Sequence, residues 1–124
     1  MSTWESGRES DLLDDIIAGR KIIEGRLNKG KFADYQVGDI VHLRRDIRGE
    51  DGILRDGEPH AAKVEVIGIR TYPTFLSMVE AEGYRRVIPR ARSAEEAASE
   101  YDKFYSREDQ EKYGVLAIEV GIAE

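Results

Sequence analysis

The longest strand pattern in the chain does most to limit its fold. Residues 62–72 alternate apolar and polar side chains, with Val64 and Val66 on one face, and this period of two predicts a β-strand. The apolar phase then shifts by one position at Ile67, next to Gly68. A β-bulge produces a shift of this kind, and a bulge lets a sheet curl. We therefore expect a small curled β-sheet or β-barrel.

Weaker patterns on both sides of this strand predict the other elements. Ser10 is a suitable N-cap for a helix that ends at Gly19, and Gly83 and Gly114 are suitable ends for two later helices. The full expectation is helices at 10–18, 73–82, 93–105 and 106–113, strands at 22–27, 40–44, 62–72 and 115–122, and an extended piece at 84–89. Such a mixture indicates an α+β fold in which helices flank the sheet.

Length and composition limit the class of protein. A chain of 124 residues, 40% hydrophobic and 35% charged, fits one globular domain. We assign residues 1–9 to an N-terminal tail and residues 10–124 to this single domain. The sequence has no apolar run long enough to span a membrane, no signal-peptide pattern and no cysteine. We therefore expect a cytoplasmic protein without disulfides or membrane contact.

The two histidines give no metal signal. His42 and His60 are eighteen positions apart in the sequence, with no cysteine and no paired histidine spacing. Zinc and other transition metals need closely spaced nitrogen or sulfur ligands. The sequence therefore predicts neither a metal site nor a cofactor.

The charge pattern permits a selective anion site. The net charge of −6 argues against indiscriminate binding to nucleic acid. The negative charge lies at the two ends, however, and residues 20–92 hold more basic than acidic side chains. A local basic groove on an acidic protein would select its ligand.

A short charged strand is the candidate site. Residues 19–27 read as a strand, yet they include Lys21, Glu24 and Arg26. Charged groups are costly to bury unless they are paired, so this strand is either an exposed edge or the wall of a polar cleft. As an exposed surface ion pair, Glu24 and Arg26 would contribute only about 0–1 kcal/mol to the stability of the fold. For all three to line one cleft, Lys21 must lie before the regular strand, because alternate strand residues share a face.

Further residues are weaker candidates. Glu82 could supply a second carboxylate, although a solvated helix face explains it as well. The basic residues that could extend a groove are Lys29, Lys31, Arg44, Arg45, Arg85, Arg86, Arg90 and Arg92. Tyr84 is suited to base stacking, as are Tyr35 and Tyr72. Tyr101, Phe104 and Tyr105 stand at helical spacing and are expected in the core.

Several of these residues carry a family resemblance. The pattern Gly19-x-Lys21-x-x-Glu24-x-Arg26 resembles the signature of the ASCH domain, a member of the PUA-like superfamily. The turn at 37–40 and the ending at 104–118 resemble the corresponding parts of small bacterial members. The resemblance implies a small PUA-like β-barrel flanked by helices, with a cleft lined by the signature charges. It also implies RNA, or nucleotide-like pieces of RNA, as the ligand class.

Three functional hypotheses follow. The first is a binding module for RNA, a nucleoside or a nucleotide, with Lys21, Glu24, Arg26, Lys29, Lys31, Arg44, Tyr84 and Arg85 as binding residues. The second is a metal-independent hydrolase that uses Lys21 with Glu24 or Glu82, either a ribonuclease or an enzyme similar to the family's N4-acetylcytidine amidohydrolases. That branch has a threonine where this chain has Glu24, which argues against it. The third is a protein-interaction domain with a vestigial cleft. The sequence leaves the oligomeric state open.

Overall fold

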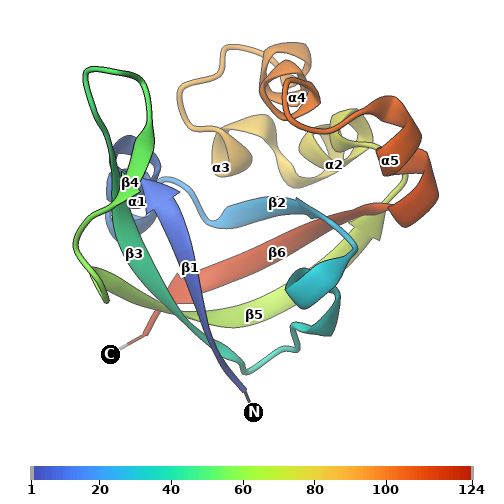
Figure 1. The fold of residues 1–124 in the computed structure, drawn as a ribbon. Coiled ribbons are helices and arrows are strands. Elements are labelled where there is room, and N and C mark those ends of the chain that lie inside the picture. The colour runs from blue at the N-terminus through green and yellow to red at the C-terminus, as the bar shows by residue number, and fades with distance from the viewer. Residues whose placement is uncertain (1, 124) are drawn as a thin grey trace.

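The computed structural model describes residues 2–123. Its six-stranded sheet has the order β1-β3-β5-β6-β2, and β4 pairs with β3 (Figure 1). The strands are β1 (Thr3–Glu9), β2 (Ile23–Leu27), β3 (Ile40–Arg48), β4 (Leu54–Asp56), β5 (Ala62–Tyr72) and β6 (Val115–Ile122). The helices are α1 (Ser10–Ile17), α2 (Phe75–Glu82), α3 (Tyr84–Val87), α4 (Ala94–Asp102) and α5 (Arg107–Tyr113), with a 3₁₀ turn η1 at Gly30–Asp34. This confirms the predicted α+β class.

The sheet curls, but it does not close into a barrel within residues 2–123. The register between β5 and β6 shifts between Val66 and Gly68, at the predicted bulge. β1 and β2 are the two ends of the strand order, so the barrel part of the expectation is wrong for this chain. A side-chain contact, and not a backbone ladder, bridges the edge strands β1 and β2. The Arg8 Nε of β1 donates to the Glu24 carboxylate of β2 at 3.0 Å.

The N-terminal segment is a strand rather than a tail. Thr3–Glu9 form β1, which runs parallel to β3 with Thr3 opposite Ile40. Asp39 fixes the start of this strand, since its carboxylate accepts from the Ser2 backbone N–H and from the Trp4 indole, each at 2.9 Å. The sequence pattern did not predict this strand, because two of its buried positions hold the polar residues Ser6 and Arg8.

Two hydrophobic clusters hold the helices to the sheet. The first joins α2 and α4 to β2 and β6, and it includes Phe75, Met78 and Ala117. The second joins α1 to β3, β5 and β6, and it includes Leu13 and Val66. Figure 1 shows α2, α3, α4 and α5 gathered beside β2, with α1 near the opposite end of the sheet. The two groups of helices therefore flank the open edges of β1 and β2.

Two local predictions differ from the structure. The piece at 84–89 is helical at Tyr84–Val87, because Tyr84, Val87 and Ile88 have the three- and four-residue spacing of one helix face. The helix expected to reach residue 105 ends at Asp102. Phe104 therefore lies outside the helix, and 78% of its surface is exposed.

Candidate functional site

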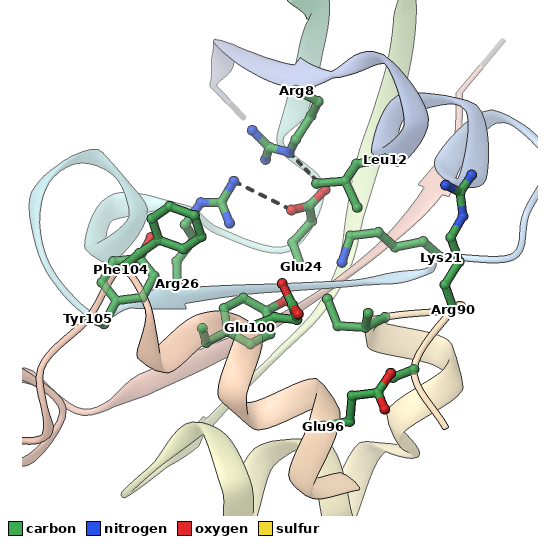
Figure 2. A pocket seen from close by; sticks show the side chains of 13 residues that line it. Arg8, Leu12, Lys21, Glu24, Arg26, Arg90, Glu96, Glu100, Phe104 and Tyr105 are labelled. Carbon is green, nitrogen blue, oxygen red and sulfur yellow. Dashed lines mark hydrogen bonds and ion pairs between the residues drawn. The ribbon is translucent and has the colours of Figure 1, made fainter. Parts of the chain in front are cut away.

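A cavity of about 370 Å³ lies between the edge strands and α4. Lys21, Glu24 and Arg26 line it from β2 and the segment before it, and Arg8 lines it from β1. The remaining lining residues come mainly from α1, α4 and the segments on either side of α4: Leu12, Ile88, Arg90, Ala91, Glu96, Glu100, Tyr101, Phe104 and Tyr105. Figure 2 shows the Glu24 carboxylate between the guanidinium groups of Arg8 and Arg26.

Lys21 reaches this cavity because it precedes the regular strand. α1 ends before Gly19, whose φ of 79° is the left-handed conformation that glycine adopts readily. The Lys21 Nζ donates to the carbonyl oxygens of Ile23 at 2.8 Å and Val87 at 2.5 Å. Burial lowers the pKa of Lys21 from 10.5 to about 8, although the charge of Glu24 opposes this change. The amine is therefore much closer to losing its proton than an exposed lysine.

Glu24 is a buried carboxylate held in the ionised state. Its Oε1 accepts from Arg8 Nε at 3.0 Å, and its Oε2 lies 3.6 Å from Arg26 Nη2. Burial alone would raise the pKa of Glu24, but the charges of Arg8, Lys21 and Arg26 outweigh it and hold the pKa well below its usual range. The carboxylate can accept hydrogen bonds from a ligand, but it is poorly suited to donate a proton.

The floor of the cavity carries an excess of positive charge. At the floor, Arg8, Lys21 and Arg26 surround the Glu24 carboxylate, whereas the carboxylates of Glu96 and Glu100 line the cavity from α4. Burial, followed by repulsion from Arg8, lowers the pKa of Arg26. A ligand that brings a phosphate or a polarised carbonyl oxygen would reduce this repulsion, and a guanidinium can bind either group through two N–H donors.

Aromatic side chains lie on the opposite wall, which also carries Glu96 and Glu100. Tyr101 stacks on Phe75 with ring centroids 4.4 Å apart, so its ring belongs to the core and to the cavity wall at once. Its close packing requires Gly25, because a Cβ at that position would lie 2.8 Å from the Tyr101 Cζ. Tyr105 is partly buried, whereas Phe104 stands exposed at the wall. Such rings provide flat apolar faces on which a nucleobase can stack.

The structure separates the remaining predicted site residues into three groups. Lys29 and Lys31 line a second depression that shares Arg26 and Tyr105 with the cavity. Tyr84 and Arg85 line a different, open depression together with Gly83 and Arg86, and the cavity-lining residues include neither of them.

Arg44 and Glu82 are engaged in ion pairs away from the cavity lining. Arg44 Nε donates to Asp46 at 2.6 Å. The Glu82 carboxylate accepts two hydrogen bonds from Arg70, at 2.6 and 2.7 Å, and one from the Tyr72 hydroxyl. The Arg70 and Tyr72 hydrogen bonds outweigh burial and lower the pKa of Glu82. The structure therefore does not bring Glu82 together with Lys21.

Sequence reasoning missed Arg8 and the role of the aromatic wall. Arg8 lies in the segment expected to be a tail, yet it is as buried as Glu24. The inward positions of β1 include Ser6 and Arg8 instead of apolar residues, so residues 3–9 carry no strand pattern that points to Arg8. Tyr105 packs against the core, as expected, and it also borders both depressions.

Residues 2–123 contain neither a metal-binding cluster nor a membrane-spanning helix. Within this range no group of three or more His, Asp or Glu side chains is arranged to hold a metal ion. In the same part of the chain, no helix combines the length and the apolar character needed to cross a membrane.

The open curled sheet and its flanking helices define a small α+β domain with a PUA-like fold. The ASCH domain family model matches residues 10–123, and the chain belongs to this family. A search of the curated proteins found no match.

Solved structures agree with this assignment. The crystal structure of hypothetical protein PH0355 is 38% identical, with a TM-score of 0.81 over 98% of this chain and 99% of that one. The solution structure of protein PF0455 from Pyrococcus furiosus is 36% identical, with a TM-score of 0.76 over 98% of both chains. An ASCH domain from Lactobacillus crispatus shares the fold at 14% identity, with a TM-score of 0.68 over 98% of this chain and 79% of that one.

Proposed function

We propose that the cavity binds one nucleoside unit of RNA or of a nucleotide. The observation that carries this proposal is that Arg8, Lys21, Glu24 and Arg26 line one cavity together with the aromatic rings of Tyr101, Phe104 and Tyr105. A volume of about 370 Å³ lies at the lower end of the range for small-molecule sites, which suits a single nucleoside better than a longer ligand. Membership of the ASCH family supports RNA as the ligand class.

The geometry suggests a role for each charged side chain. Arg26 would bind a phosphate or a base carbonyl through its guanidinium group. Glu24, held ionised by its arginine neighbours, would accept a hydrogen bond from an exocyclic amino group. Lys21 has two N–H groups committed to the Ile23 and Val87 carbonyls, so a protonated amine has a third donor for the ligand. Tyr105 and Phe104 would stack on the base.

Ligand titration tests this proposal. The four ribonucleosides, their monophosphates and a labelled single-stranded RNA are titrated at low salt into the wild-type protein and Arg26→Ala. Hydrogen bonds to charged groups contribute about 1.5–3 kcal/mol, so Arg26→Ala should weaken binding by about ten- to a hundredfold. The matched control is Arg107→Ala, an exposed arginine on α5, which should leave affinity unchanged. A folded wild-type protein that binds none of these ligands would overturn the proposal.

The state of Lys21 favours a second candidate, a metal-independent hydrolase. Burial lowers the pKa of Lys21 to about 8, and a neutral amine there would offer a lone pair to a water molecule. For N4-acetylcytidine, Lys21 would take a proton from water as the water oxygen attacks the acetyl carbonyl. The C–N bond then breaks as the Lys21 ammonium returns the proton to the N4 nitrogen, so that cytidine leaves as the neutral amine and acetic acid leaves and ionises to acetate. Glu24 is ion-paired and unsuited to act as the acid.

Product analysis decides between the two candidates. If the protein is a hydrolase, incubation with N4-acetylcytidine releases acetate, or incubation with single-stranded RNA gives shorter fragments, and the rate rises with pH through about 8 because Lys21 must be neutral. Lys21→Met should then abolish turnover. Binding without any product would leave the binding module as the function.

A further inference from the structure

A second depression adjoins the cavity and is not needed to hold a nucleoside. Its volume is about 200 Å³, and it is lined by Arg26, Leu27, Lys29, Gly30, Lys31, Phe32 and Tyr105. Arg26 and Tyr105 also line the main cavity. A ligand seated against Arg26 in the cavity therefore has the depression directly beside it.

The lining of this depression contains cations and no carboxylate. The Lys29 Nζ lies over the Tyr113 ring, 4.9 Å from its centroid, and the Lys31 Nζ lies over the Phe32 ring at 5.3 Å. Lys31 also donates to the Glu5 carbonyl oxygen at 2.8 Å. In the part of the chain that the structure describes, neither lysine forms a salt bridge. Their charges are therefore available to an anion from solution.

Neighbouring cations add to the positive potential here. Burial, followed by repulsion from Arg8 and Arg26, lowers the pKa of Lys31. The Arg26 guanidinium stands over the Phe32 ring at 5.1 Å, which links the cavity to the depression through one side chain. An anion bound between Lys29, Lys31 and Arg26 would relieve the repulsion among these cations.

The backbone that carries the two lysines is fixed between β2 and η1. The Lys29 N–H donates to the Leu27 carbonyl at 2.8 Å, and the Asn28 N–H donates to the Gly114 carbonyl at 3.0 Å. Gly30 has a φ of 61°, a left-handed conformation that favours glycine. A tight turn thus places both lysines at one depression before any ligand arrives.

We infer that this depression is a phosphate subsite, which binds the phosphate attached to the nucleoside in the main cavity. The ligand class is then a nucleoside phosphate rather than a free nucleoside. The inference rests on the proposed function, because the nucleoside must occupy the cavity for its phosphate to reach Lys29 and Lys31. The phosphate comes either from a free nucleotide or from a single strand of RNA.

A comparison of ligands with and without phosphate tests the inference. The four ribonucleosides, their 3′- and 5′-monophosphates and a single-stranded oligoribonucleotide are titrated into wild type, Lys29→Ala/Lys31→Ala and a matched control. The control, Arg55→Ala/Lys63→Ala, removes the same charge from β4 and β5. In wild type, a 3′- or 5′-monophosphate should bind about tenfold more tightly than its nucleoside. The Lys29→Ala/Lys31→Ala protein should lose this gain and keep its nucleoside affinity, and its salt slope should fall by about 1–2.

Each result has a distinct meaning. If a monophosphate binds more tightly than its nucleoside, and this difference disappears in Lys29→Ala/Lys31→Ala, the subsite is supported. If the oligoribonucleotide then binds more tightly than the monophosphate, the phosphate belongs to an RNA strand. If the two bind equally, it belongs to a free nucleotide. If nucleosides and their monophosphates bind equally, or if the gain survives Lys29→Ala/Lys31→Ala, the subsite is overturned and the cavity proposal stands. If wild type binds no ligand, the cavity proposal fails, and the subsite fails with it.

Discussion

The buried amine of Lys21 gives a prediction that does not depend on any ligand. Only 3% of Lys21 is exposed, and burial lowers its pKa from 10.5 to about 8. An unfolded chain would keep the proton up to a pH near 10.5, whereas the folded protein releases it near 8. Between these values the unfolded state binds more protons, so stability must rise with pH.

The size of this effect follows from the pKa difference. Each pKa unit corresponds to about 1.4 kcal/mol, so the shift from 10.5 to about 8 gives about 3 kcal/mol across that pH range. The penalty for burying the charge is fully present below pH 8 and is lost as the pH approaches 10.5. Lys21→Met removes the titrating amine, so this pH dependence is lost. The substitution also leaves the carbonyl groups of Ile23 and Val87 without a donor, which lowers the free energy of unfolding by an amount that does not vary with pH.

Urea denaturation at several pH values between 7.5 and 10.5 measures this difference. The free energy of unfolding of wild type should rise relative to Lys21→Met by about 3 kcal/mol across the range. Groups present in both proteins, including the buried Tyr101, cancel in the difference. Lys112→Met, which removes an exposed lysine, should run parallel to wild type. If wild type and Lys21→Met are also parallel, Lys21 has an ordinary pKa and the account of its environment is wrong.

Three more variants probe the floor and wall of the cavity. Glu24→Gln should lower the free energy of unfolding at pH 7 by about 3 kcal/mol in urea denaturation, because Arg8 is left buried without a counter-charge. Since the pKa of Glu24 is lowered in the folded state, the stability difference between wild type and Glu24→Gln should shrink as pH falls below about 4.5. The acid losses from Asp39 and Glu82, whose pKa values are also lowered, are common to both proteins, and a difference that does not change with pH would contradict the ionised state of Glu24. Gly25→Ala should cost about 1–3 kcal/mol by the same assay, because its Cβ would lie 2.8 Å from Tyr101; unchanged stability would contradict the close contact. Phe104→Ala should leave stability within about 0.5 kcal/mol, because the ring is exposed, but it should weaken RNA binding, and unchanged affinity would exclude stacking on Phe104.

The sequence predicted the curled sheet because its signals are local. The phase shift at Ile67 and the adjacent Gly68 stand within one strand, and the bulge occurs between Val66 and Gly68. Closure of the barrel, in contrast, depends on whether two strands distant in sequence pair. Arg8 and Glu24 occupy that gap as a buried ion pair, and no pattern within either segment predicts this contact.

The candidate site was predictable only where its residues are close in sequence. Lys21, Glu24 and Arg26 stand on one short segment, and the helix end at Gly19 indicated that Lys21 could precede the strand. Arg8 was missed because a strand whose buried positions include polar groups lacks the apolar alternation that identifies strands. Glu82 was a plausible carboxylate by composition, but its pairing with Arg70 depends on tertiary packing.

The most direct test of the cavity as an RNA site is a crystal structure of the protein with a short single-stranded oligoribonucleotide. We expect electron density for one base in the cavity, beside the Glu24 carboxylate and against Tyr105, with the attached phosphate near Lys29 and Lys31. Density at another surface, for example over Tyr84 and Arg85, with nothing in the cavity, would contradict the account.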